Sequence, residues 1–114
     1  MVRRGAAPER GDVVWLSFSP QAGREQAGRR PALVLSPAEF NRRAGLAMVC
    51  PVTSRIKGYP FEVPLRAAAE VSGVVLVDQL RSLDWRARRA EPAGKAPAAV
   101  MTEVLAKLRS LLGD

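Results

Sequence analysis

The chain of 114 residues has the length of a single domain, residues 1–114, and its hydrophobic content of 47% is ordinary for a globular protein. Lysine and arginine number 18 against 11 aspartates and glutamates, and the resulting net charge of +7 favours a polyanionic partner such as nucleic acid, or an acidic protein. The sequence has no histidine and a single cysteine, which excludes an internal disulfide, the usual zinc sites and every triad or pair that relies on imidazole.

The first third of the chain is expected to contain two strands separated by a loop. Residues 1–11 are charged and rich in glycine and proline, and we expect them to form a loose arm. Apolar and polar side chains alternate over 12–19, which predicts a half-buried strand ending at a proline. A polar loop over 21–30 follows, and the apolar run 31–35 predicts a buried strand.

The junction between that loop and that strand holds the best-positioned cation in the chain. Pro31 fixes its own φ and biases Arg30 towards extended geometry, so Arg30 is the first loop residue held on rigid scaffold. A guanidinium keeps its charge and grips two phosphate oxygens at once. Together with Glu25 in the loop, Arg30 suggests a site for a phosphate-bearing substrate, although a solvated basic loop would look the same.

A short helix and a third strand are predicted next. Ser36 at the N-cap and Glu39 at the third helical position make a capping box, and 41–45 is the expected exit of the helix. The apolar run 46–52 predicts a strand in which Pro51 must occupy an edge or a bulge.

The second half of the chain predicts further strands and a C-terminal helix. A basic loop over 53–59 precedes an alternating strand at 61–65, a connector at 66–72 and a β-branched strand at 73–77. Residues 80–90 are expected to continue the sheet through a turn near Asp84.

The remaining residues predict a loop over 91–97, then a helix of about four turns that ends at Gly113. Its apolar stripe consists of Val100, Val104, Leu108 and Leu111. Such a stripe more commonly packs on the sheet, and the alternative is that it forms a dimer interface. The expected fold class is therefore mainly β with short helices and a C-terminal helix packed on the sheet.

Cleavage of RNA suits a chain that lacks imidazole. RNA carries its own nucleophile, the 2′-hydroxyl, so catalysis needs a positioned phosphate, charge stabilisation and proton transfer, with no metal or other cofactor in principle. Arg30, Thr53 and Glu25 match these roles in kind. Thr53 would otherwise end a strand by bonding to backbone, and Glu25 would otherwise pair with a neighbouring arginine.

Four segments carry a resemblance to a known family. They are GDVVWLSFSP at 11–20, EQAGRRPALVLSP at 25–37, VCPVTSRIKGYPFEV at 49–63 and GVVLVDQLRSLDWRAR at 73–88. In this order and spacing they resemble the MazF/PemK toxins, the mRNA-cleaving halves of bacterial toxin-antitoxin pairs.

The resemblance implies an SH3-like small barrel related to the CcdB-type toxins, a homodimer, and metal-independent cleavage of single-stranded RNA that leaves 2′,3′-cyclic phosphate and 5′-hydroxyl ends. It assigns the family's key arginine to Arg30, its key threonine to Thr53 and its loop acid to Glu25. The implied RNA-binding residues are Gln26, Arg29, Ser54, Arg55, Lys57, Gln79, Arg81 and Arg86.

The implied protein partner is an antitoxin whose acidic, disordered tail folds into the same basic groove. The alternative is a non-catalytic SH3-like toxin or binding module that acts on a protein target such as a topoisomerase. No apolar stretch approaches the roughly 18 residues of a membrane span, so we expect a cytoplasmic protein without a membrane partner.

Overall fold

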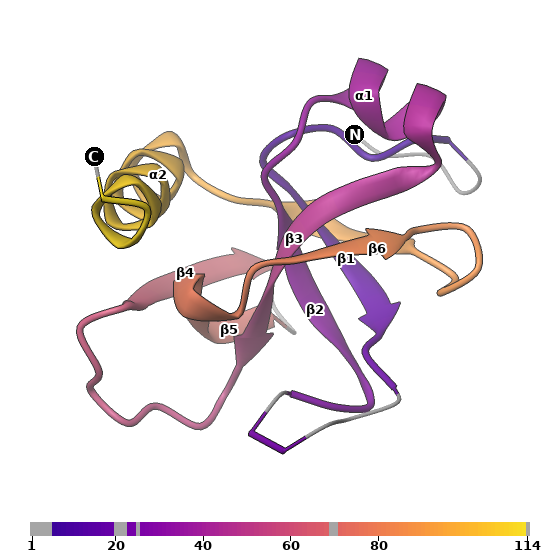
Figure 1. The fold of residues 1–114 in the computed structure, drawn as a ribbon. Helices are drawn as coiled ribbons and strands as arrows, with labels where there is room; N and C mark the ends of the chain where they lie inside the picture. Colours follow the sequence, from indigo (N-terminus) through magenta and orange to yellow (C-terminus); the bar gives the residue numbers. More distant parts are fainter. Residues whose placement is uncertain (1–5, 20–22, 25, 69–70, 114) are drawn as a thin grey trace.

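The computed structural model describes residues 6–19, 23–24, 26–68 and 71–113 of the chain (Figure 1). Its elements are β1 (Asp12–Ser17), β2 (Arg29–Val34), α1 (Ala38–Ala44), β3 (Leu46–Thr53), β4 (Glu62–Ala68), β5 (Val71–Leu76), the 3₁₀ turn η1 (Val77–Gln79), β6 (Arg81–Asp84), β7 (Glu91–Lys95) and α2 (Ala98–Leu111). The strands pair antiparallel in the order β4-β5-β3-β2-β1-β7, and β6 pairs with β3 beside that path. This curled sheet with its C-terminal helix confirms the predicted fold class.

β3 pairs with three other strands, β2, β6 and β5. One edge pairs with β2, while the other pairs with β6 from Leu46 to Val49 and then with β5 at Val52 and Thr53. Pro51 lies in the gap between these two ladders, where its missing N–H breaks no ladder hydrogen bond on that edge. The proline therefore occupies an inner strand rather than a sheet edge, and Thr53 is carried to the point where β5 begins to pair.

The inner strands are buried on both faces. Val13 and Leu33 belong to a core cluster that includes Val104 of α2, whereas Val14 and Val34 belong to a second cluster on the opposite face. Because side chains alternate along a strand, neighbouring residues of β1 and β2 fill the two clusters. Val100, Val104 and Leu108 of the α2 stripe pack on the core, as predicted, whereas Leu111 is exposed. Neither described helix is long and apolar enough to cross a membrane.

Three predicted boundaries were wrong. The expected connector at 66–72 is mostly strand, because β4 and β5 extend into it and pair with each other. The turn expected near Asp84 is present after β6, but the strand expected to resume by residue 90 begins only at Glu91. The loop expected over 91–97 contains β7, which pairs with β1 although its sequence EPAGK has no strand pattern.

The predicted capping box at α1 was also wrong. The N-cap is Pro37 in an extended conformation, and no side chain caps the helix. The Ser36 hydroxyl instead donates to the buried Asn41 side chain. The helix continues through its expected exit to Ala44 and ends at Gly45, which takes the left-handed conformation (φ 72°) that glycine adopts without penalty.

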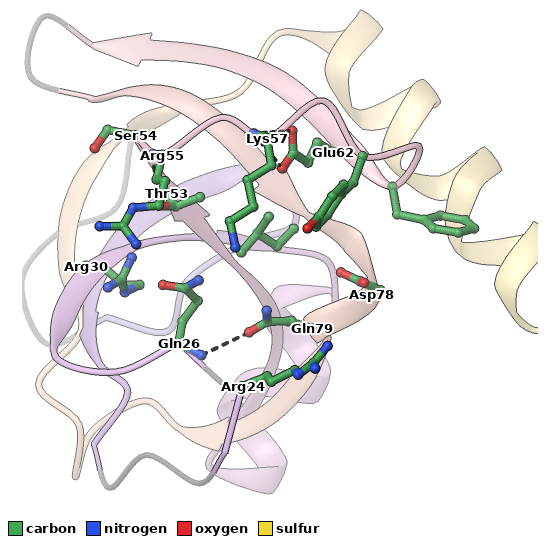
Figure 2. A pocket seen from close by; sticks show the side chains of 13 residues that line it. Arg24, Gln26, Arg30, Thr53, Ser54, Arg55, Lys57, Glu62, Asp78 and Gln79 are labelled. Carbon is green, nitrogen blue, oxygen red and sulfur yellow. Dashed lines mark hydrogen bonds between the residues drawn. The ribbon is translucent and has the colours of Figure 1, made fainter.

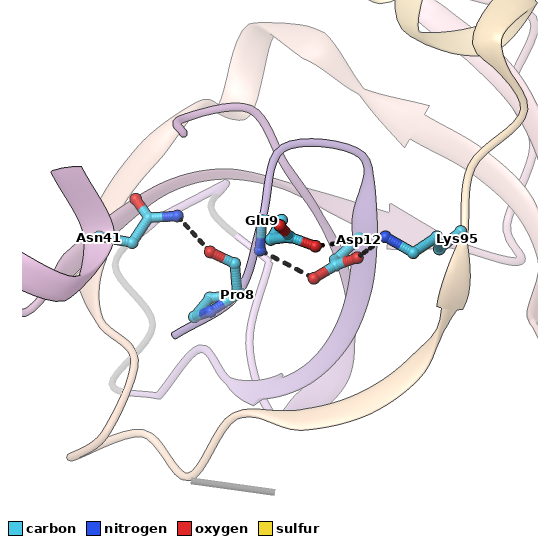
Figure 3. A network of polar contacts seen from close by, with 5 residues as sticks. All are labelled: Pro8, Glu9, Asp12, Asn41 and Lys95. Atoms are coloured by element: carbon cyan, nitrogen blue, oxygen red, sulfur yellow. Dashed lines mark hydrogen bonds and ion pairs between the residues drawn. The ribbon is translucent and has the colours of Figure 1, made fainter. Parts of the chain in front are cut away.

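The described part of the N-terminal segment is folded, which corrects the expectation of a loose arm over 1–11. Asn41 Nδ2 donates to the Pro8 carbonyl at 2.8 Å, as Figure 3 shows. The backbone N–H of Gly11 donates to the Val34 carbonyl at 2.8 Å. These bonds fix residues 8–11 against α1 and β2, and residues 1–5 lie outside the described residues.

A lysine and a buried aspartate join this segment to β7. Asp12 is fully buried, and its carboxylate accepts bonds from Lys95 Nζ and from the Glu9 backbone N–H, each at 2.8 Å (Figure 3). The hydrogen bond to Asp12 raises the pKa of Lys95 above its ordinary value of 10.5.

The raised pKa of Lys95 predicts that the fold loses stability at alkaline pH. A raised folded-state pKa stabilises the fold fully below pH 10.5, and that contribution disappears as pH rises through the folded-state value. We expect the unfolding free energy of the wild type to fall more steeply above about pH 10.5 than that of Lys95→Met. Urea unfolding from pH 8 to pH 11 measures both slopes, and parallel curves would contradict the assignment.

Candidate functional site

A cleft of about 770 Å³ lies between the segment that precedes β2, the loop from β3 to β4, and η1 (Figure 2). It is lined by Arg24, Gln26, Arg30, Thr53, Ser54, Arg55, Lys57, Tyr59, Phe61, Glu62, Leu76, Asp78 and Gln79. Four of these side chains are cationic and two are acidic, so the cleft is suited to an anionic ligand.

The pairing of β2 with β3 brings Arg30 and Thr53 to one place. Ala32 lies opposite Pro51 in this antiparallel ladder. Continuing the register by two residues places Arg30 opposite Thr53, on the same face of the sheet. Figure 2 shows both side chains at one end of the cleft, so two residues that are 23 positions apart in sequence lie close together in space.

Arg30 belongs to β2, although its position was predicted to be the end of a loop. Its Nε donates to the Ala27 carbonyl at 3.0 Å, which is the one acceptor for this side chain among the described residues. The terminal nitrogens are therefore available to a ligand. Partial burial lowers the pKa of Arg30 from its usual value of 12.5, but a guanidinium still keeps its charge at neutral pH.

Thr53 ends β3 with a nearly buried hydroxyl. The residue is only 9% exposed, and its Oγ1 accepts a hydrogen bond from the Arg55 backbone N–H at 3.1 Å. None of the described residues accepts the hydroxyl proton. The hydroxyl proton is therefore free to be donated to a ligand in the cleft, beside the Arg30 guanidinium.

Two further contacts shape the cleft. The Gln79 side-chain oxygen accepts the Gln26 backbone N–H at 3.0 Å, which holds the segment before β2 onto η1. The buried Glu62 carboxylate accepts the backbone N–H groups of Lys57 and Gly58, the latter at 2.9 Å. One of the two acidic side chains in the cleft is therefore already bonded to backbone.

The structure separates the nominated RNA-binding residues into two groups. The group that lines the cleft is Gln26, Ser54, Arg55, Lys57 and Gln79, together with the nominated catalytic residues Arg30 and Thr53. The group that does not line it is Arg29, Arg81 and Arg86. Glu25, nominated as the loop acid, lies outside the described residues.

Arg29, Arg81 and Arg86 bond to the protein itself. Arg29 follows the alternation of β2 to the face opposite Arg30, where it donates to the Arg89 carbonyl at 2.8 Å and to Glu91 at 2.6 Å. Arg81 donates to the backbone carbonyl of Phe18, and its guanidinium carbon lies 5.8 Å from the centre of the Phe18 ring. Arg86 lies 4.6 Å from the Trp85 ring centre. None of these three guanidinium groups lines the cleft, and their contact with RNA stays a prediction.

Sequence reasoning missed several residues that line the cleft. They are Arg24, Tyr59, Phe61, Glu62, Leu76 and Asp78. Asp78 could have been found, because it precedes the nominated Gln79 directly after a buried strand. Tyr59, the single tyrosine of the chain, stands in the nominated basic loop and was a second available signal.

The single cysteine has no catalytic role in this arrangement. Cys50 is fully buried in β3 and does not line the cleft. Burial raises the pKa of its thiol to about 12, so the reactive thiolate is not formed at neutral pH.

Comparison with known proteins relates the chain to one family. Residues 9–112 match the sequence profile of the family described as PemK-like, MazF-like toxin of type II toxin-antitoxin system. The chain is 44% identical over 106 residues to the endoribonuclease toxin MazF of Escherichia coli K12, covering 93% of this chain and 95% of the relative. It is 38% identical to the endoribonuclease PemK of Escherichia coli, covering 98% and 87%.

Solved structures show the same architecture. The crystal structure of MazF from Deinococcus radiodurans superposes with a TM-score of 0.90 at 65% identity, covering 95% of this chain and 98% of that one. A MazE-MazF crystal structure from the same organism gives a TM-score of 0.82 at 60% identity, covering 94% and 96%.

Proposed function

The chain belongs to the PemK-like, MazF-like family of type II toxin-antitoxin toxins, and we propose that this endoribonuclease toxin cleaves single-stranded mRNA at a short sequence, without a metal ion, in the cleft between Arg30 and Thr53. The observation that carries the proposal is the convergence of a guanidinium and a donor hydroxyl at one end of a cationic cleft. Both groups stabilise negative charge on a phosphate, and neither needs imidazole.

The proposed reaction uses the nucleophile that RNA supplies. The 2′-oxygen attacks the adjacent phosphorus, the bond from phosphorus to the 5′-oxygen breaks, and the products are a 2′,3′-cyclic phosphate and a 5′-hydroxyl. Arg30 holds the scissile phosphate and stabilises its added charge, while Thr53 donates to a non-bridging oxygen. A base removes the 2′ proton, and the departing 5′-oxygen gains one.

Glu25 is the proposed base. A glutamate with its ordinary pKa near 4.3 is ionised at pH 7 but accepts protons weakly, so this role requires a raised pKa in the bound complex. Removal of Glu25 should therefore slow the reaction less than removal of the groups that stabilise the phosphate.

Thr53→Val tests the hydroxyl without changing the volume of the side chain. A hydrogen bond to a charged group contributes about 1.5–3 kcal/mol, so we expect the single-turnover rate to fall roughly 10- to 150-fold. Thr53→Ser keeps the donor and should retain most of the activity. Equal rates for the wild type and Thr53→Val would show that the hydroxyl does not act on the phosphate.

The reaction class is tested by incubating the purified protein with single-stranded RNA in EDTA and analysing the ends. We expect products with cyclic phosphate and 5′-hydroxyl ends. A metal-dependent nuclease would be inactive under these conditions, and a binding module that acts on a topoisomerase would give no products at all. Sequencing the same ends identifies the recognised sequence.

The proposed protein partner is an antitoxin with an acidic, disordered tail. The MazE-MazF structure from Deinococcus radiodurans is of a toxin-antitoxin pair. The cations of the cleft and the net charge of +7 suit an acidic segment that folds on binding and excludes RNA from the same place.

We also propose a homodimer and a cytoplasmic location. A second copy would cover an apolar hollow of about 400 Å³ on which Phe40 and Met48 are partly exposed, beside Leu105 and Leu108 of α2. The proposed mRNA substrate and the unpaired thiol of Cys50 both fit the cytoplasm.

A further inference from the structure

The cleft has a second end with a different chemical character. Figure 2 shows Glu62 and Asp78 away from the end that holds Arg30 and Thr53. Glu62 lies opposite Leu76 in the pairing of β4 with β5, and Leu76 also lines the cleft. Tyr59 and Phe61 complete this lining, so one wall of a phosphate-binding cleft is apolar and aromatic.

Tyr59 presents its ring on a fixed piece of backbone. The residue is 60% exposed, yet its carbonyl accepts the Glu62 backbone N–H at 3.1 Å. On one side Gly58 N–H donates to the Glu62 carboxylate, and on the other Lys107 Nζ donates to the Pro60 carbonyl. A large exposed ring held in this way binds a ligand with little further loss of conformational entropy.

Lys57 lies over one face of the Tyr59 ring. Its Nζ lies 5.7 Å from the centre of the Tyr59 ring, within the range of a cation–π contact, and it also lines the cleft. A strand of RNA places a charged phosphate and a flat base next to each other at every nucleotide. The ammonium group over the ring offers a partner for the phosphate, and the remaining exposed surface of the ring offers one for the base.

We propose that Tyr59 is a stacking platform for one unpaired nucleobase of the RNA, with Lys57 on the adjoining phosphate. The inference rests on the proposed function and adds a subsite to it, at the end of the cleft away from the scissile phosphate. Stacking requires an unpaired base, because the faces of a paired base are already covered in a helix. This subsite thereby supplies a physical reason for a single-stranded substrate.

The first test is binding of an RNA that cannot be cleaved. Single-stranded RNA with 2′-O-methyl groups throughout is titrated by fluorescence anisotropy against the wild type, Tyr59→Ala and Tyr59→Phe. Loss of one base–aromatic stack should weaken binding by Tyr59→Ala roughly 5- to 150-fold, and Tyr59→Phe should bind like the wild type. Ile56→Ala is the matched control, since Ile56 is 64% exposed in the same loop but does not line the cleft.

The second test locates the base. A series of cleavable RNAs carries one abasic nucleotide at successive positions around the cut. In the wild type, one abasic position should lower kcat/KM by the same factor as Tyr59→Ala does, and in Tyr59→Ala that position should cost nothing further. Abasic profiles that are identical in the wild type and the variant would overturn the proposal.

Failure of the proposed reaction and failure of the proposed subsite give different results. If no RNA is cleaved but Tyr59→Ala still weakens binding and Ile56→Ala does not, the proposed reaction fails and the subsite stands. If cleavage proceeds and binding by Tyr59→Ala is unchanged, the subsite fails and the reaction stands. Equal weakening by Tyr59→Ala and Ile56→Ala would indicate a disturbed loop and would also reject the platform.

Discussion

Replacing Arg30 with alanine is expected to slow RNA cleavage by about 10²- to 10³-fold, the usual cost of removing one preorganised group that stabilises transition-state charge. Arg30 lies on β2 with its Nε bonded to Ala27, so its terminal nitrogens are held in place before the substrate arrives. Such a group costs no reorganisation during the reaction. Single-turnover cleavage of an RNA with one target site, at saturating protein, measures the effect on the chemical step.

Arg30→Lys and Arg109→Ala are the comparisons for this variant. Lysine keeps the charge but loses the planar fork that grips two phosphate oxygens, so we expect Arg30→Lys to recover only part of the loss. Arg109 is an exposed arginine of α2 outside the cleft, and its removal changes the net charge equally. Slow cleavage by Arg109→Ala would show that the loss of rate comes from the change in net charge. Cleavage by Arg30→Ala at the wild-type rate would show that Arg30 takes no part in the reaction.

Gly73→Ala is expected to reduce cleavage by at least about 10²-fold through a backbone clash beneath Thr53. A Cβ atom at Gly73 would lie 2.2 Å from the Thr53 carbonyl oxygen and 3.2 Å from Ser54 Cα. Both neighbours are backbone atoms, so the end of β3 must move. A displacement of about 1 Å at a catalytic group costs about 10²-fold, and overpacking costs about 1–3 kcal/mol of stability.

The stability cost and the catalytic cost of Gly73→Ala are measured separately. Urea unfolding gives the first, and cleavage at a temperature well below the transition gives the second. Ser72→Ala, one residue earlier in β5 and exposed, should affect neither. If Gly73→Ala is folded and fully active, then cleavage does not depend on the precise backbone position of Thr53.

The strands with clear alternation or β-branched runs could be predicted from the sequence, but the pairing that builds the site could not. Arg30 and Thr53 were nominated separately, and they meet because Ala32 lies opposite Pro51. That register is set by the burial of both faces of β2 and β3, which is a property of the whole core. The family resemblance named these two residues, and the register gives the physical reason that they converge.

The predictions that failed depended on local signals that tertiary contacts override. Glu91–Lys95 contains proline and glycine and no apolar alternation, yet it forms β7 because β1 offers an edge to pair with. The capping box at Ser36 was lost to a hydrogen bond with Asn41. Alternation along β2 sends the guanidinium groups of Arg29 and Arg30 to opposite faces, so Arg29 lies outside the cleft and its role in RNA binding stays a prediction.

The central claim is that Arg30 and Thr53 promote attack by the ribose 2′-hydroxyl on the neighbouring phosphate. A single 2′-deoxy nucleotide placed on the 5′ side of the cut bond removes that nucleophile and leaves the base and the phosphate in place. In EDTA, we expect cleavage to stop at this position and to continue at an unmodified copy of the site in the same RNA. Cleavage at the deoxy position at an unchanged rate would contradict it.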